Sequence, residues 1–138
     1  MSAPPAGSAP PATDTGQHQL FDGIPSFEGS EALLFDSGSA EDAAKLPDMA
    51  TFVRLQVEFP TANPNPAELD AGLSLLLFVE DLASPRARVR LADLVRQGGA
   101  RPLNVQRQAG QRVRLVLADP AKAWAGSAPA VRVVLDCA

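Results

Sequence analysis

Short runs in which apolar and polar residues alternate dominate the chain from Leu20 onward, and glycine, proline, asparagine or aspartate bounds each run. A two-residue period places the apolar side chains on one face of an extended strand. In 111–118 (QRVRLVLA), Val113, Leu115 and Leu117 share one face and the arginines share the other. Strands are predicted at 31–36, 51–59, 72–80, 86–91, 102–107, 111–118 and 130–136.

Helix signals are few and short. Ser39 followed by Asp42 resembles a helix cap, and Asn65 before Pro66 and the stretch LADLVRQGG each favour about one or two turns. About seven closely spaced strands with one or two short helices predict a mainly β fold. The predicted architecture is an antiparallel β-sandwich of the Ig-like or C2-like type.

The 138 residues are enough for one domain with a proper core. Residues 1–19 are rich in proline, alanine, glycine and serine, and they contain too little apolar surface to offset the entropy of ordering. We predict that residues 1–19 form a disordered or extended N-terminal arm. Residues 20–138 are predicted to form a single β-sandwich domain.

The segment 72–80 (GLSLLLFVE) departs from simple alternation, because Leu76 and Phe78 give it a second apolar face. A strand that is apolar on both faces is covered on both. Two covers are open: the acidic, partly apolar segment 19–36 of the same chain, or a neighbouring subunit.

The outward positions of the strands combine arginines with large apolar side chains. In 51–59, alternation places Val53 inward and Phe52 and Arg54 outward. Aromatic residues together with arginine are enriched at protein–protein interfaces, whereas cross-strand ion pairing with acidic residues is the alternative use of the arginines. The candidate interface residues are Phe52, Arg54, Leu76, Phe78, Arg88, Arg90, Arg112, Arg114 and Arg132.

The net charge of −4 results from an acidic first part, residues 1–81, and a basic second part, residues 82–138. Such asymmetry is found in proteins that bind nucleic acid, and also where two parts of one chain pack together. The overall negative charge, the scarcity of lysine and the lack of an aromatic platform make nucleic-acid binding the weaker interpretation.

The residue types that perform most chemistry are scarce. The chain has one histidine (His18), one cysteine (Cys137) and no tyrosine, and it lacks a nucleophile elbow and a glycine-rich phosphate loop. We therefore predict no enzyme activity, no catalytic residue and no cofactor. The segment 36–42 (DSGSAED) offers oxygen ligands for a weak calcium site, although helix capping explains it better.

Trp124 lies in a loop, PAKAWAGSAP, and is the candidate for a ligand site. An exposed tryptophan stacks on sugar rings, which favours a small-ligand or carbohydrate-binding function, whereas packing over the end of the sandwich is the alternative. No apolar run reaches the length of a membrane helix, and the N-terminus does not resemble a secretory signal. With a single cysteine as well, the sequence predicts a cytoplasmic protein without membrane insertion, with leaderless export as the alternative.

Five segments in the order TFVRLQVEFP, LSLLLFVEDL, RARVRLADLV, QRVRLVLADP and APAVRVVL resemble the β-sandwich domain that follows the catalytic region in bacterial tyrosinase-like proteins. The resemblance covers residues 51–135 and is one of strand pattern. In that family the copper ligands are histidines of a separate helical region, and nothing in this chain matches them. The resemblance implies a non-catalytic accessory sandwich that packs on a larger protein.

Together these observations predict a non-catalytic structural or protein-interaction module, as a subunit of an oligomer or as the partner of a larger protein. Ligand binding by the loop around Trp124 is the alternative.

Overall fold

The computed structural model describes residues 16–124 and 127–138. Within these residues the chain forms nine strands and three short helices. They are β1 (Gly16–Gly23), β2 (Phe27–Glu28), β3 (Glu31–Asp36), α1 (Ala40–Ala43), β4 (Ala50–Glu58), α2 (Pro66–Leu69), β5 (Ser74–Val79), β6 (Ala87–Arg90), α3 (Leu91–Arg96), β7 (Ala100–Arg107), β8 (Val113–Ala118) and β9 (Val131–Cys137).

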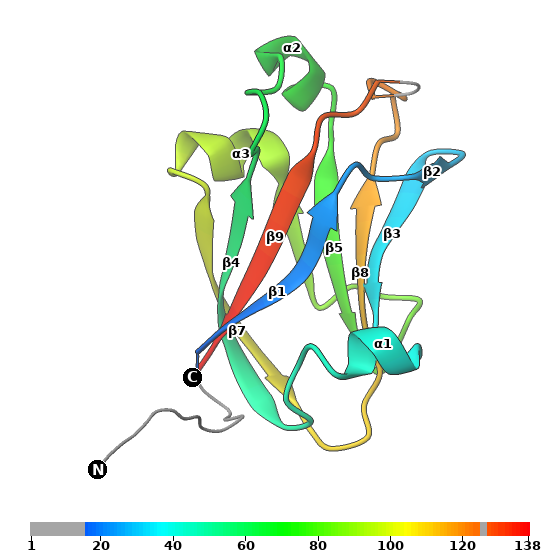
Figure 1. Ribbon diagram of the computed structural model, residues 1–138, viewed down its shortest axis with the longest axis vertical. Coiled ribbons are helices and arrows are strands. Elements are labelled where there is room, and N and C mark those ends of the chain that lie inside the picture. Colours follow the sequence, from blue (N-terminus) through cyan, green and yellow to red (C-terminus); the bar gives the residue numbers. More distant parts are fainter. Residues whose placement is uncertain (1–15, 125–126) are drawn as a thin grey trace.

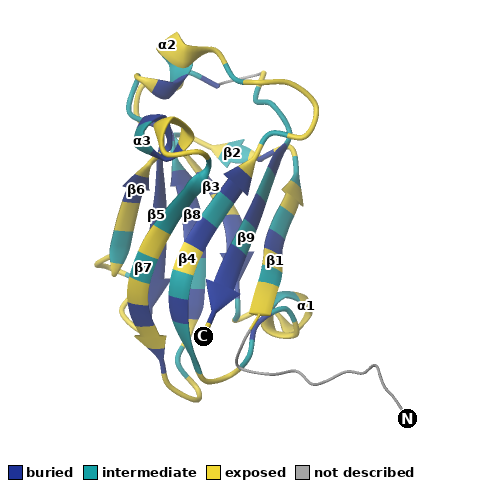
Figure 2. Cartoon of the chain, turned by 90° about the vertical axis from the view of Figure 1, so that its left-hand side faces the viewer, coloured by how far each residue is buried: buried dark blue, intermediate teal, exposed yellow. Residues whose placement is uncertain are grey.

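The strands form two antiparallel sheets, which confirms the predicted mainly β, two-sheet fold. The four-stranded sheet has the order β1-β9-β4-β7, and the five-stranded sheet has the order β2-β3-β8-β5-β6 (Figure 1). One large apolar core contains side chains from both sheets, such as Leu55 and Leu135 from one and Leu75 and Leu115 from the other. Buried residues are interspersed with more exposed ones along β4, whereas every residue of β5 is buried (Figure 2).

The structure has two strands more than the sequence indicated, β1 and β2. Residues 16–19, which the sequence assigned to the arm, belong to β1 and pair with β9 from Gly16 opposite Cys137 to Gln19 opposite Val134. Only Leu20 of β1 is buried, so this edge strand is held by its backbone ladder and has no apolar period to reveal it. The rest of the predicted arm, residues 1–15, lies outside the described residues.

A β-bulge in β4 corrects the prediction for Phe52. Against β9, the register of β4 shifts between Phe52 and Arg54, so Val53 is an extra residue of β4 there. Against β7, the extra residue of the shift lies in β7, between Pro102 and Val105. A bulge turns the residues on either side of it, and both Phe52 and Leu55 therefore point into the core. Phe52 is 0% exposed and does not belong to any surface.

The stretch ARVRLADLVRQGG contains β6 and α3 and leads directly into β7, so it carries the chain from the five-stranded sheet to the four-stranded sheet. Gly98 and Gly99 end α3, and the Gly99 N–H donates to the Leu94 carbonyl (2.8 Å). Gly99 has a φ of +89°, and a Cβ there would lie 3.0 Å from the Val57 carbonyl oxygen. Glycine is therefore required at this crossing, which places β6 and β7 at the same side margin of the sandwich.

Candidate interaction surface

The outer face of the five-stranded sheet carries two cross-strand rows of side chains. In one row, Leu33 of β3, Val116 of β8, Leu76 of β5 and Arg88 of β6 lie opposite one another in register. In the next row, Asp36, Arg114 and Phe78 are opposite one another. Residues directly opposite across a sheet point to the same face, so these rows form one surface, which we call the outer face.

The apolar centre of the outer face is a small cluster of Leu76, Phe78 and Val116, separate from the main core. These three side chains are 8–9% exposed. Their cover comes partly from the chain itself, because Leu82, in the loop between β5 and β6, packs against the cluster. The predicted second apolar face of this strand is thus present, and it borders a hollow of about 320 Å³ that Arg88 and Arg114 also line.

The segment 19–36 does not lie across this face, as one of the two predicted covers required. Instead it contributes β3, which lies in the plane of the same sheet beside β8. A bulge at Leu34 turns Phe35 into the core and leaves Leu33 on the outer face. Leu33 is 54% exposed and extends the apolar cluster toward solvent.

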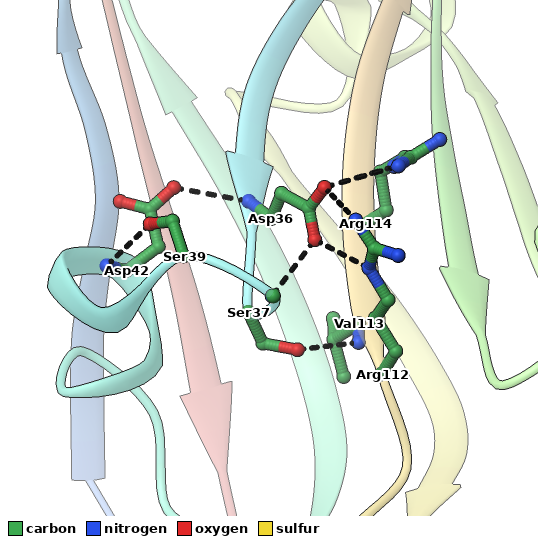
Figure 3. Close-up of polar contacts among 8 residues, drawn as sticks. Asp36, Ser37, Ser39, Asp42, Arg112, Val113 and Arg114 are labelled. Atoms are coloured by element: carbon green, nitrogen blue, oxygen red, sulfur yellow. Dashed lines mark hydrogen bonds and ion pairs between the residues drawn. The ribbon is translucent and has the colours of Figure 1, made fainter.

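Asp36 holds two arginines, Arg112 just before β8 and Arg114 on β8, at the rim of the outer face (Figure 3). The Arg112 Nε and Nη2 donate to the two carboxylate oxygens at 2.8 and 2.6 Å, and the Arg114 Nη2 donates to Oδ2 at 3.0 Å. The Gly38 N–H donates to Oδ1 as well. Hydrogen bonding to Arg112 above all holds the pKa of the Asp36 carboxyl well below its usual range, against the opposing effect of burial, and the same contact raises the pKa of Arg112.

The polar side chains of Asp36, Ser39 and Asp42 in the segment 36–42 form hydrogen bonds and ion pairs that stabilise the local fold. The Asp42 carboxylate accepts from the Asp36 N–H and pairs with Lys45 (2.9 Å), while the Ser39 hydroxyl accepts from the Asp42 N–H as the cap of α1. Both carboxylates are therefore already neutralised by cations. Among the described residues, no three His, Cys, Asp or Glu side chains are grouped as metal ligands are.

The predicted arginines Arg54 and Arg132 lie on the other sheet, on the outer face of β4 and β9. Arg54 and Gln56 both donate to Asp136, and Arg132 donates to Glu58 (3.1 Å). The candidate interface residues thus divide between two opposite faces. The alternative of cross-strand ion pairing describes Arg54 and Arg132 correctly.

Four arginines of the described chain have no carboxylate within ion-pair distance: Arg86, Arg88, Arg90 and Arg101. Every other described arginine contacts a carboxylate. Arg86 precedes β6, Arg88 and Arg90 are on β6, and Arg101 is on β7. β6 and β7 lie at the same side margin of the sandwich (Figure 2), so these uncompensated charges are gathered there; we call these four arginines the basic margin.

Trp124 is packed at the end of the sandwich. Its side chain is 1% exposed, its Nε1 donates to Glu68 of α2 (3.2 Å), and its ring meets Phe59 edge to face. Asp119 accepts from the N–H groups of Ala123 and Trp124 and so holds the loop closed. The indole presents no open face for a sugar, in agreement with the packing alternative.

A groove of about 480 Å³ lies next to this tryptophan, between α2, α3 and the segment after β4. Phe59, Pro66, Leu69 and Val95 line it, and Arg96 stands at its rim in an ion pair with Asp70 (3.1 Å). Trp124 does not line this groove, although Phe59 connects the two.

Four residues of the outer face and the basic margin are absent from the interface residues predicted from the sequence: Leu33, Leu82, Arg86 and Arg101. Leu33 belongs to a run of four apolar residues, 32–35, whose bulge has no sequence signal. Leu82 lies in a loop, and Arg101 stands beside Pro102 at the start of a strand without alternation. Whether Arg88 and Arg90 have ion-pair partners depends on the tertiary fold. The sequence gives only one indication, which is that residues 82–92 contain no acidic residue.

Comparison of the chain with protein family models, with curated proteins and with solved structures finds no match. The resemblance of residues 51–135 to the accessory sandwich of tyrosinase-like proteins stays a prediction. Over the residues that the structure describes, no helix has the length and apolar character needed to cross a membrane.

Proposed function

We propose that this chain is a non-catalytic β-sandwich of the Ig-like or C2-like type that binds another protein through the outer face of its five-stranded sheet. The observation that carries this proposal is the apolar cluster of Leu76, Phe78 and Val116 on a solvent-facing sheet surface. Exposed Leu33 continues the cluster, and Arg88, which has no carboxylate within ion-pair distance although Glu31 lines the same hollow, borders it. An apolar centre with arginine at its rim is the composition of protein interfaces.

The opposite sheet offers a useful contrast. Its outer face carries Arg54, Gln56 and Asp136 in mutual contact, and Arg132 with Glu58. Charged side chains that already form ion pairs within the chain contribute little to the affinity for a protein partner. The two faces are thus unequal among the described residues: the apolar cluster of the five-stranded sheet borders Arg88, which has no ion-pair partner, whereas Arg54 and Arg132 of the four-stranded sheet are paired.

Site-specific photocrosslinking in cells that produce the chain tests the proposal. A benzophenone side chain in place of Leu33 is expected to form one covalent adduct, whose second component is identified by mass spectrometry. The matched control is the same group in place of Met49, which is 51% exposed but lies at the start of β4, away from the outer face. Because Leu82 borders the cluster, L82D should abolish the Leu33 adduct. Equal adducts at positions 33 and 49, or none at position 33, would refute the proposal.

A second candidate function is suggested by the groove beside α2, whose lining is mostly apolar. Pockets of a few hundred Å³ with apolar walls and few polar groups are typical of small-ligand sites. The chain has a single tryptophan, which packs on Phe59 of the groove, so its fluorescence reports on occupancy. We expect an apolar carboxylate to change this emission, because Arg96 stands at the rim, and sugars to leave it unchanged. A sugar-induced change that survives F59L would favour carbohydrate binding instead.

A further inference from the structure

The free edge of β6 has the features of a docking site for an extended peptide. β6 is the last strand of the five-stranded sheet, and its only ladder partner among the described strands is β5 (Figure 2). An unpaired strand edge exposes backbone donors and acceptors to which a further strand can bind.

The register shows which backbone groups of β6 are available. The Leu91 N–H donates to the Leu73 carbonyl (2.9 Å), and Val89 is opposite Leu75. Backbone groups along an antiparallel strand point alternately toward one neighbour and the other. Since Leu91 and Val89 face β5, the N–H groups of Arg88 and Arg90 and the Arg88 C=O face away from the sheet, whereas the Arg90 C=O belongs to the first turn of α3, whose N-cap is Arg90.

The charge at this edge selects the partner. Arg86, Arg88, Arg90 and Arg101 are the basic margin, and none of them has a carboxylate within ion-pair distance among the described residues. The Arg88 side chain also lines the hollow on the outer face. A strand added to β6 would therefore meet guanidinium groups at its outward-facing positions.

Two other occupants fit less well. Charged edge strands protect sheets from joining edge to edge, and two copies of β6 paired with each other would set arginine near arginine. Nucleic acid would use the arginines for its phosphates but not the strand's backbone groups, and β6 and β7 contain no aromatic residue for base stacking.

We infer that β6 binds an extended acidic segment of another protein as an additional strand, with its acidic side chains over Arg88 and Arg90. This inference rests on the proposed function and specifies how the partner is recognised. Backbone hydrogen bonds to the edge would supply affinity, and the basic margin would select alternating acidic residues.

Amide hydrogen exchange by NMR tests the inference with the full chain. The probe is a terminally blocked peptide of alternating glutamate and threonine. In the free protein, the Arg88 and Arg90 amides should exchange faster than the Val89 amide, because only the latter faces β5. The peptide should slow exchange at Arg88 and Arg90 and leave Val89 unchanged. A peptide of the same sequence with every backbone nitrogen methylated should give no protection, and neither should a lysine–threonine peptide.

Two substitutions at one position separate backbone recognition from charge. R88A should weaken peptide binding by about two- to fivefold, as expected for the loss of an exposed ion pair. R88P removes the same charge and also the outward N–H, without loss of a bond to β5, so binding should fall by a further factor of about three to ten. Thermal unfolding confirms that both variants remain folded.

The outcomes are distinct from those of the crosslinking experiment. Protection at Arg88 and Arg90 by the unmethylated acidic peptide alone supports the inference. Equal binding of the methylated peptide, equal affinities of R88A and R88P, or protection of this edge by an oligonucleotide in place of the peptide overturns it. If a Leu33 adduct forms while no peptide protects β6, the interaction function stands and edge recognition is wrong.

Discussion

Replacing Asp36 with asparagine is expected to lower the free energy of unfolding by about 2 kcal/mol at neutral pH, close to the cost of removing charge-assisted hydrogen bonds. Asp36 is buried and accepts from Arg112, Arg114 and the Gly38 N–H. The amide keeps the shape of the carboxyl but loses its charge and one acceptor. Since the arginine side chains are 45% and 31% exposed, they regain water, and the cost stays below that of a fully buried pair.

The effect of D36N should depend on pH in one direction. The folded-state pKa of Asp36 lies below the value near 4 that is typical of an unfolded chain. A lowered pKa stabilises the folded state at every pH above the unfolded value, and this contribution is lost as the pH falls toward the folded value. The difference in unfolding free energy between the wild type and D36N should therefore be constant from pH 7 to about 5 and shrink below about pH 4.

Urea unfolding at several pH values measures this difference. The control is D22N, because Asp22 is half exposed and approaches Arg132 only to 3.9 Å, so its replacement should change stability by less than about 0.5 kcal/mol at any pH. A D36N effect that is independent of pH would mean that the carboxylate has no charge-specific role.

The strand pattern was predictable from sequence because burial on one face imposes a two-residue period. All seven predicted segments contain a strand, and β3 (Glu31–Asp36) agrees to the residue. β1 and β2 were not predictable in this way, because as edge strands they bury few side chains. Edge strands are held by backbone bonds, to which every residue type except proline contributes equally.

The candidate surface was predictable only in part. Leu76 and Phe78 stood out because an apolar residue at an outward position contradicts simple alternation, and the structure places them together with Arg88 and Arg114. The partners of the arginines were not predictable, because Asp36 and Arg112 are 76 residues apart in the chain. Which arginine lacks an ion-pair partner therefore depends on the order of the strands in the sheets, and the alternation of apolar and polar residues does not determine that order.

The bulge at Val53 leads to the prediction with the largest effect. Unbroken alternation places Val53 in the core and Phe52 in solvent, whereas the structure buries Phe52 completely and leaves Val53 partly exposed. F52A should therefore lower the free energy of unfolding by about 3–5 kcal/mol, as expected for an aromatic side chain removed from a core. V53A should cost about 1 kcal/mol or less.

Comparing F52A with V53A shows whether β4 has a bulge at Val53 or alternates without a break. Each substitution acts as the control of the other. Chemical denaturation of both variants under one condition gives the two values, and F52L, which retains most of the apolar volume, should recover more than half of the loss. If V53A proves more costly than F52A, the strand has no bulge there and Phe52 faces solvent. Arg54 faces outward in either register, because Leu55 and Val57 lie in the core in both, so the comparison tests the bulge itself and leaves the contact between Arg54 and Asp136 unaffected.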